Sequence, residues 1–427
     1  MAAVAAAVLT AGGLAVPAAF AGAGDLAFVN CNGLLPDCTS TAPWNAVSGA
    51  DAVAVTPDGT NLYVAALTGG YNADISHFTI DRAGNLTYRD CIGDTPGCTP
   101  TSPAHVLDLT VSLAVSPDGR NLYAAGGGLY YGSVSHLSIG DRGSLTYDGC
   151  YGYFTGCTQT NPEEALSGAA AVTVTPDGKH LYVASESKGA VSHLTIDAAG
   201  NLTFDGCVSN FLAGCTPFGA SSSAVFEALA VTPDGKYLYA LSGFTAPGAV
   251  YQFVIDPAGI LLFTGCIGNE PTCVPVSPPN MLYGGTGLLV NPAGGNLYVS
   301  ARHAVSYFRI GASGTLIYTG CIGNVTGCRV PSPAGALEGA DGLAATSDGA
   351  HVYVPSESGS EVSRFGVDAS GNLVFAGCTG ELAGCAGTSL IHALDGAFAV
   401  AVSPNNTHLY VAGFEGDDVS HFTIAGF

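Results

Sequence analysis

Hydrophobic and polar positions alternate in short runs along the whole chain, and this pattern predicts β-strands. In one clear stretch, Ala171 to Thr175 is a run of small and β-branched residues that leads into the tight turn Pro176-Asp177-Gly178. Further strands are predicted over His180 to Ala184, Ala190 to Asp197 and Leu202 to Cys207. Antiparallel strands joined by short turns form a single four-stranded sheet.

The same unit recurs with a period of about 58 residues, which is typical of repeat architectures. The turn returns as Pro57-Asp58-Gly59, Pro117-Asp118-Gly119 and Pro233-Asp234-Gly235, and in altered form in the later units. A tyrosine follows each turn at a constant distance: Tyr63, Tyr123, Tyr182, Tyr239, Tyr298, Tyr353 and Tyr410. Seven units of four strands predict an all-β, seven-bladed β-propeller, with the turn aspartates as turn-forming residues.

The two ends of the chain predict how the ring closes. The last unit stops after Val419 to Ile424 and lacks a fourth strand, whereas Asp25 to Asn30 is a strand without a unit of its own. We expect the N-terminal strand to complete the seventh blade, because closure removes exposed strand edges. Residues 22–427 are therefore predicted to form one domain without linkers.

All 14 cysteines fall into pairs that recur once per unit. An even number of cysteines in an exported chain predicts disulfides, and the spacing is too wide for the usual zinc knuckle. Local pairing predicts Cys31–Cys38, Cys91–Cys98, Cys150–Cys157, Cys207–Cys215, Cys266–Cys273, Cys321–Cys328 and Cys378–Cys385.

The first residues form an apolar run of small side chains that ends in Ala19-Phe20-Ala21. We interpret residues 1–21 as a signal peptide, which predicts a secreted, extracellular protein. A membrane anchor is the alternative, although Pro17 and the many Ala and Gly residues disfavour a spanning helix. No membrane span is expected in the mature chain.

Composition narrows the classes of partner. The chain has 33 acidic residues against 11 basic residues and a formal net charge of −22. This balance argues against nucleic acid, whose backbone requires clustered Lys and Arg, and it permits cations or cationic partners. Hydrophobic residues make up 48% of the chain, enough for a substantial core.

The motifs resemble one known family. Ser-Pro-Asp-Gly-Arg-Asn-Leu-Tyr (116–123), Val-Ser-His-Leu-Ser-Ile (134–139) and Gly-Ser-Leu-Thr (143–146) are similar to lactonase-type seven-bladed propellers. That family includes 6-phosphogluconolactonase and carboxymuconate cyclase, and this chain resembles a secreted, cysteine-rich variant. The resemblance implies the propeller fold and raises hydrolysis of a lactone as a possible activity.

Functional residues in a repeat protein are expected where the repeat is broken. Aligned on the turns, the first positions of the inner strands form a ring at one end of the channel: Asp51, Val111, Ala170, Glu227, Thr286, Asp341 and Phe398. Oxygen ligands suit Ca²⁺, so Asp51, Glu227 and Asp341 are candidate ligands of a calcium ion. The alternative is that these acids, and others on nearby loops such as Glu357 and Asp418, are solvated residues.

The fifth unit shortens its loop to Ala301-Arg302-His303-Ala304, which places a rare cation at the same end of the channel. A lactone hydrolase needs a base to activate water and a cation to stabilise the oxyanion. His303 or Glu338 is the candidate base, Arg302 the candidate cation, and Asp341 a neighbouring acid. A surface ion pair in a tight hairpin is the alternative interpretation.

Other candidates have structural explanations. One repeated position carries His77, His136, His193 and His421, which are predicted to pack within separate blades. His105 and His392 match each other in units two and seven. Trp44 is either an exposed ligand platform or a plug against the Cys31–Cys38 loop.

Taken together, the sequence predicts a secreted module that binds an unidentified extracellular ligand or protein. A lactone hydrolase at Arg302, His303, Glu338 and Asp341 is the first alternative. A Ca²⁺-stabilised cell-surface or matrix component is the second.

Overall fold

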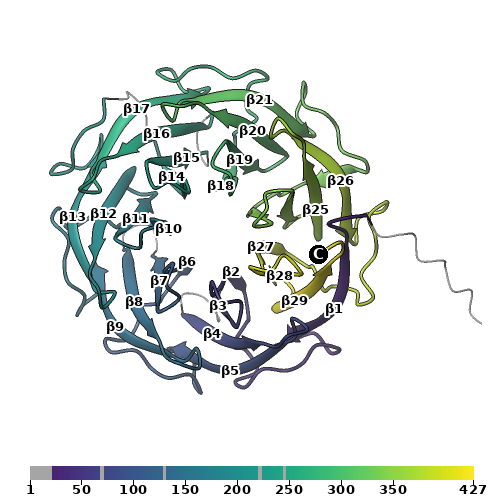
Figure 1. Cartoon of the computed structure of the whole chain (residues 1–427). Helices are drawn as coiled ribbons and strands as arrows, with labels where there is room; N and C mark the ends of the chain where they lie inside the picture. The colour runs from purple at the N-terminus through teal and green to yellow at the C-terminus, as the bar shows by residue number, and fades with distance from the viewer. Residues whose placement is uncertain (1–21, 68–71, 128–130, 220–223, 244–246) are drawn as a thin grey trace, which may run out of the picture.

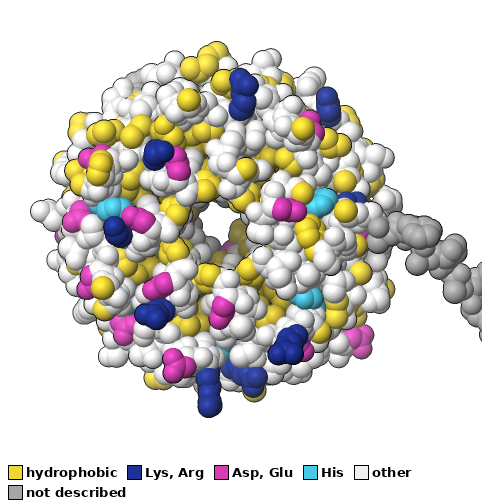
Figure 2. Space-filling view, in the orientation of Figure 1, with side chains coloured by type: hydrophobic (Ala, Val, Ile, Leu, Met, Phe, Trp, Pro, Cys, Tyr) yellow, Lys and Arg dark blue, Asp and Glu magenta, His cyan; other side chains and the backbone are white. Residues whose placement is uncertain are grey.

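In a computed structural model, seven antiparallel sheets of four strands each surround an open central channel (Figures 1 and 2). The structure describes residues 22–427 except 68–71, 128–130, 220–223 and 244–246. The predicted signal peptide, residues 1–21, lies outside the described residues. Across the described ranges every regular element is a strand, and no helix long and apolar enough to cross a membrane is found.

Each blade is numbered by its order along the chain, from the inner to the outer strand. Blades 1 to 4 consist of β2 (Ala50–Val55), β3 (Asn61–Leu67), β4 (Ala73–Ile80), β5 (Leu86–Gly93); β6 (Thr110–Val115), β7 (Asn121–Gly126), β8 (Ser133–Ile139), β9 (Leu145–Gly152); β10 (Ala169–Val174), β11 (His180–Ser185), β12 (Ala190–Ile196), β13 (Leu202–Ser209); and β14 (Phe226–Val231), β15 (Tyr237–Ser242), β16 (Ala249–Ile255), β17 (Leu261–Gly268).

Blades 5 to 7 consist of β18 (Gly285–Val290), β19 (Asn296–Ala301), β20 (Ala304–Ile310), β21 (Leu316–Gly323); β23 (Ala344–Ala345), β24 (His351–Ser356), β25 (Glu361–Val367), β26 (Leu373–Gly380); and β27 (Ala397–Val402), β28 (His408–Gly413), β29 (Asp418–Ile424), β1 (Leu26–Gly33). The short strand β22 (Ala334–Leu337) lies in the segment that connects blades 5 and 6.

The predicted ring closure is confirmed. Strand β1 pairs antiparallel with β29, with Leu26 opposite Ile424 and Asn32 opposite Val419 (Figure 1). Blade 6 also holds the start of the chain, because Arg364 Nη1 donates to Ala23 O at 2.6 Å and its guanidinium pairs with Asp25. Arg364 occupies the repeated position that is histidine in four other blades, so this break in the repeat lies at the seam of the ring.

Burial follows the position of a strand within its blade. The second strands β7 and β28 are buried along their whole length, because neighbouring blades cover both of their faces. The outer strands alternate: Leu202 to Gly206 is in turn half-buried and exposed, before the strand end becomes buried at Cys207. The alternation of hydrophobic and polar residues therefore corresponds mainly to the outer strand of each blade, which is half exposed to solvent.

One tyrosine contact joins each pair of neighbouring blades. The repeated tyrosine of each second strand is fully buried, and its hydroxyl donates to a glycine carbonyl of the next blade. The pairs are Tyr63–Gly143, Tyr123–Gly200, Tyr182–Gly259, Tyr239–Gly314, Tyr298–Gly371, Tyr353–Gly24 and Tyr410–Gly84, at 2.7 to 3.0 Å. The sequence revealed the repeated tyrosines but not this partner.

The repeated turn uses its aspartate as predicted. In blade 3, Thr175 Oγ1 donates to Asp177 Oδ1 at 2.6 Å, and the backbone N–H of Lys179 donates to the same oxygen at 3.2 Å. These bonds lower the pKa of Asp177 although partial burial opposes them. The aspartate therefore stabilises the turn, and nothing in its contacts requires a ligand.

Blade 6 departs from the regular pattern at its inner strand. Its inner strand β23 has only two residues, and the segment before it touches β24 through single contacts such as Asp341 N to Pro355 O at 3.1 Å. Pro355 has no N–H to return to that segment, so the ladder cannot continue there. The same irregularity places Asp341 in a separate, non-strand stretch.

All seven predicted disulfides are present, one per blade. In each blade the outer strand runs two residues beyond its first cysteine, as β13 does from Cys207 to Ser209. The chain then folds back, so that Thr216 N donates to Cys207 O at 2.8 Å. Local disulfides of this kind are typical of chains that fold in an oxidising compartment.

Candidate functional site

A bulge residue in each blade forms the ring that the repeat alignment predicts. In six blades the register between first and second strands skips one residue, namely Asp51, Val111, Ala170, Glu227, Thr286 or Phe398. In blade 6, Ala340 bridges Ser356 and Ala344 pairs with Tyr353, which leaves Asp341 at the same place. The seven positions are therefore structurally equivalent. Beside them, the loop between the second and third strands contacts the segment that enters the blade; in blade 5, for example, Arg302 N of the loop donates to Gly284 O of that segment.

One acid of this ring is influenced by acids of a blade that is not its neighbour. Burial raises the pKa of Asp51 to about 7, and the negative charges of Asp341 and Glu357 act in the same direction. Asp51 belongs to blade 1 and the other two to blade 6, and blade 7 lies between these blades in the ring. This end of the channel, formed by Asp51, Asp341 and Glu357, is called the acidic mouth below.

Asp341 is held by blade 5 but is incompletely satisfied. Thr286 Oγ1 donates to Asp341 Oδ1 at 3.1 Å, and Ser300 Oγ donates to its backbone carbonyl. Its other carboxylate oxygen, Oδ2, is buried without a hydrogen-bond partner among the described residues. Burial raises the pKa of Asp341 to about 7; Glu357 adds to this rise, while Thr286 and the positive charge of Arg302 oppose it.

Glu227 is not brought together with the other two predicted calcium ligands. Its Oε2 accepts a hydrogen bond from Gly243 N at 2.8 Å, within its own blade 4. Among the described residues, the groups whose three ligand atoms lie within 4.8 Å of one another do not include Asp51, Glu227 and Asp341. The trio therefore lacks the close spacing of a site that binds a bare ion through all three side chains.

The predicted catalytic residues divide into a pair and two neighbours. His303 Nδ1 lies 2.7 Å from Glu338 Oε2, and Asn324 Nδ2 donates to the other oxygen of Glu338 at 2.7 Å. Arg302 and His303 form the predicted two-residue hairpin between β19 and β20, and both are exposed. Arg302 is joined to the segment of Glu338 through its backbone, whose carbonyl accepts from Gly339 N at 2.7 Å. Asp341 is buried separately, in the ring.

Three buried acids lie at the first or second position of the third strands of adjacent blades 6, 7 and 1, and the sequence reasoning missed them as a set. Glu361, Asp418 and Asp74 face the glycine that ends the outer strand of their own blade. All three are fully buried. The expectation that Asp418 is a solvated loop residue is wrong, because it lies inside β29. Its strand register, identical to that of Asp74, was the available signal.

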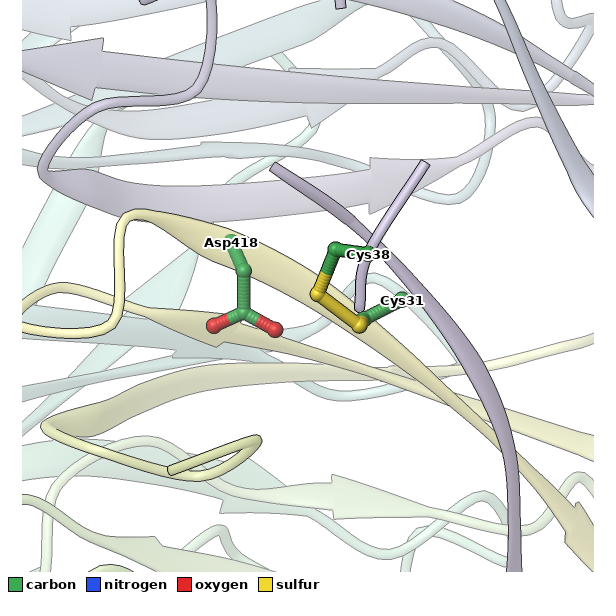
Figure 3. A group of neighbouring side chains, drawn as sticks. All are labelled: Cys31, Cys38 and Asp418. Carbon is green, nitrogen blue, oxygen red and sulfur yellow. A yellow bond between two sulfur atoms is a disulfide. The ribbon is translucent and has the colours of Figure 1, made fainter. Parts of the chain in front are cut away.

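Asp418 lies beside the disulfide of its own blade, as Figure 3 shows. Ser420 Oγ donates to Asp418 Oδ2 at 2.9 Å, and burial raises the pKa of the carboxyl well above its usual value. Both sulfurs of Cys31 and Cys38 are bonded to each other, so this group offers no thiolate to a metal ion. Burial therefore favours the neutral form of this acid, and its contacts within the blade indicate a structural role.

The repeated histidines pack within separate blades, as predicted. His136 Nε2 lies 2.8 Å from Asn121 Oδ1, and its ring stacks on Tyr123 with centroids 5.3 Å apart. His193 makes the equivalent contact with the ring of His180. His105 and His392 do not approach each other; each lies with acids of its own region.

Two further surface features lie away from the acidic mouth. Trp44 is 67% exposed, so it is not a buried plug against the Cys31–Cys38 loop. A hollow of about 630 Å³ lies between the turns at Pro176 and Pro233, and a similar one of about 510 Å³ lies between the next two turns. Because these hollows repeat with the blades, they belong to the scaffold.

Comparisons with known proteins find the same architecture. No family model and no curated protein matches the sequence. A putative 6-phosphogluconolactonase from Bacteroides fragilis superposes with a TM-score of 0.55 at 20% identity, over 83% of this chain and 88% of that chain. The periplasmic gluconolactonase PpgL of Pseudomonas aeruginosa gives 0.52 at 19% identity, over 78% and 86%.

A propeller of a different kind is equally similar. The Cps50 (Swd1) β-propeller domain of Myceliophteria thermophila gives a TM-score of 0.58 at 12% identity, over 94% of this chain and all of that domain (100%). At such identities the likeness concerns the fold and not the chemistry. The resemblance expected from the motifs is thus confirmed in architecture: the chain is a disulfide-rich, seven-bladed β-propeller similar in fold to the lactonase-type propellers.

Proposed function

We propose that this chain is a secreted binding module that holds a cationic ligand, or a basic segment of a partner protein, at the acidic mouth. The observation that carries the proposal is the electrostatic coupling of Asp51 with Asp341 and Glu357 across blade 7. A nearby negative charge raises the pKa of a buried carboxyl group, and Asp51 and Asp341 are only 6% and 7% exposed. A bound cation would neutralise these carboxylates and so remove the electrostatic cost of burying them close together.

The spacing of the acids favours an extended cation. Because the ring acids do not form a close group of ligand atoms, a guanidinium or amine bridges them better than a bare Ca²⁺ ion does. The formal net charge of −22 would attract such a ligand from a distance. Calcium at Asp51, Glu227 and Asp341 stays a prediction, for which a melting temperature that falls in chelator is the test.

The test uses an arginine-rich peptide and isothermal titration calorimetry. Affinity is expected to rise between pH 5.5 and pH 8, as the mouth acids lose their protons, and to fall at least tenfold in an Asp51→Asn, Asp341→Asn double variant. Glu163→Gln, which removes one exposed carboxylate in the segment between blades 2 and 3, is the control. Equal weakening in the control and the double variant would show that only the overall charge attracts the peptide, and would refute the proposal.

Lactone hydrolysis is the second candidate, and the contact between His303 and Glu338 favours it. In this scheme Glu338 orients the imidazole through Nδ1, Nε2 takes a proton from water, and Arg302 stabilises the developing oxyanion. Against a panel of lactones, Arg302→Ala and Glu338→Gln are each expected to reduce turnover by about 10²-fold or more. His105→Asn, which alters another exposed histidine, is the control. Turnover no faster than the uncatalysed reaction would exclude this candidate.

A further inference from the structure

Two equivalent groups of one imidazole and two carboxylates lie outside the acidic mouth. The first is Asp94, His105 and Asp108, and the second is Glu381, His392 and Asp395. In each, the first acid follows directly after an outer strand, β5 or β26, while the histidine and second acid lie in the segment that leads to the next blade. Each group therefore spans a junction between blades, 1 to 2 and 6 to 7.

The first group has the dimensions of a coordination site. His105 Nδ1 lies 3.1 Å from Asp94 Oδ2 and 3.1 Å from Asp108 Oδ2. An ion with bonds of about 2.0–2.2 Å holds neighbouring ligand atoms roughly 2.9–3.5 Å apart, depending on its geometry. In the second group, His392 Nδ1 lies 2.8 Å from Asp395 Oδ2 and 3.6 Å from Glu381 Oε1, which brackets the same range.

Protein hydrogen bonds leave one acceptor of the first group without a donor. A ring nitrogen carries at most one proton, so His105 Nδ1 can donate to Asp108 Oδ2 while the backbone N–H of His105 serves Asp94 Oδ2. The other oxygen of Asp108, Oδ1, is buried without a hydrogen-bond partner in the described part of the chain. A metal ion binds the unprotonated imidazole nitrogen, and it would accept an electron pair from each of the three converging ligand atoms.

The backbone supports the first acid in both places. His105 N donates to Asp94 Oδ2 at 2.7 Å, and His392 N donates to Glu381 Oε1 at 2.6 Å. Both histidines have a left-handed backbone, with φ of 68° and 71°. Second contacts of this kind orient a ligating carboxylate. The two groups thus repeat the same backbone arrangement as well as the same side chains.

We infer that each group is a binding site for a divalent transition-metal ion such as Zn²⁺, which would link two neighbouring blades. An imidazole nitrogen with carboxylate oxygens suits Zn²⁺ and its neighbours, whereas Ca²⁺ and Mg²⁺ prefer oxygen alone. The histidine side chains are 60% and 57% exposed, so an ion has access from solvent and water can complete its coordination.

The repeat supplies an internal comparison. At the junction of blades 4 and 5 the corresponding residues are Asn269, Asn280 and Tyr283, and Asn280 has φ of 67°. Asparagine can therefore adopt the left-handed backbone conformation of His105 and His392, and its substitution at either position removes the imidazole. Elsewhere in the described residues, the only other close group of this type is Cys31, Cys38 and Asp418, whose sulfurs form a disulfide.

The experiment titrates Zn²⁺ into chelator-treated protein by calorimetry, with melting temperature as a second readout. The wild type is expected to bind two ions, His105→Asn and His392→Asn one each, and the double variant neither. Each occupied site should raise the melting temperature, because it joins two blades. Ca²⁺ and Mg²⁺ at the same concentrations are expected to produce neither effect, and Glu163→Gln should behave as wild type.

Two results would overturn the inference. One is the absence of Zn²⁺ binding by the wild type, which would leave each histidine as a hydrogen-bonding partner of its two neighbouring carboxylates. The other is undiminished stoichiometry in the double variant, which would place the ions elsewhere. If the asparagine variants fail to fold, Asp94→Asn and Glu381→Gln test the same sites, because they replace an anionic carboxylate ligand with a neutral, weaker amide and retain the imidazole.

Discussion

The hydroxyl of Tyr410 donates a hydrogen bond of 3.0 Å to the carbonyl oxygen of Gly84, and this contact joins the last blade to the first. The equivalent tyrosine of every other blade makes the same contact with the next one. Only glycine fits at the acceptor, because Gly84 has φ of +79° and a Cβ there would lie 2.2 Å from His408 Nδ1. The ring is thus sealed by a tyrosine and glycine at each junction.

Tyr410→Phe is expected to lower the free energy of unfolding by about 1–3 kcal/mol, because it leaves the buried carbonyl of Gly84 without a donor. Urea denaturation measures the change. Tyr63→Phe should cost a similar amount, whereas Tyr153→Phe, at a tyrosine that is 44% exposed, should have little effect. Equal stability of wild type and Tyr410→Phe would contradict the role of this bond.

Removal of the N-terminal strand is expected to open the ring. A chain that begins at residue 34, with Cys38→Ser to avoid a free thiol, leaves β29 as an unpaired edge. Its thermal transition should broaden and shift down, and size-exclusion chromatography should show self-association. A chain that begins at residue 22 is the control and should melt cooperatively. A compact, monomeric truncated protein would show that β1 is dispensable.

Each disulfide is expected to add modest stability. The loop between Cys150 and Cys157, with a sequence separation of 7, limits the effect to about 2.5 kcal/mol in the chain-entropy description. A Cys150→Ser, Cys157→Ser variant should unfold at a lower urea concentration by that amount or less. A loss much larger than this would mean that the serines also disturb the buried end of β9.

The acidic mouth should make stability depend on pH. In the folded state Asp51 and Asp341 have pKa values of about 7, whereas the ordinary aspartate value near 4 applies once the chain unfolds. Between these values the folded state binds more protons, so the contribution of these groups to stability falls as pH rises from about 4 to about 7 and stays low above that.

The Asp51→Asn, Asp341→Asn double variant is therefore expected to gain stability relative to wild type as pH rises from about 4 to about 8, by a few kcal/mol in total. Urea denaturation over that pH range measures the difference. Buried histidines such as His193, whose pKa is lowered to about 4, act with the opposite sign, but they are present in both proteins and cancel. A pH-independent difference would contradict the raised pKa values.

The chain's repeat made much of the architecture predictable. A constant spacing of turn, tyrosine and cysteine pair defines a blade locally, because hairpins and eight-residue loops involve neighbours in sequence. The unmatched strand at Asp25 to Asn30 even predicted the closure with β29. The alignment on the turns also identified the seven equivalent bulge positions, since one residue per repeat falls at each.

The tertiary structure decided which of those positions act together. The charge of Asp341 acts on Asp51 because closure of the ring brings blades 1 and 6, which are distant in sequence, to the two sides of blade 7. Likewise the sequence marked His105 and His392 as a matching pair, yet each lies with two acids of its own junction between blades. A sequence repeat predicts the backbone path of one unit. Contacts between units depend instead on how the units pack around the ring and on the direction in which each side chain points. The sequence alone therefore established the ring, and the fold alone established the burial of Asp418 and the partners of each acid.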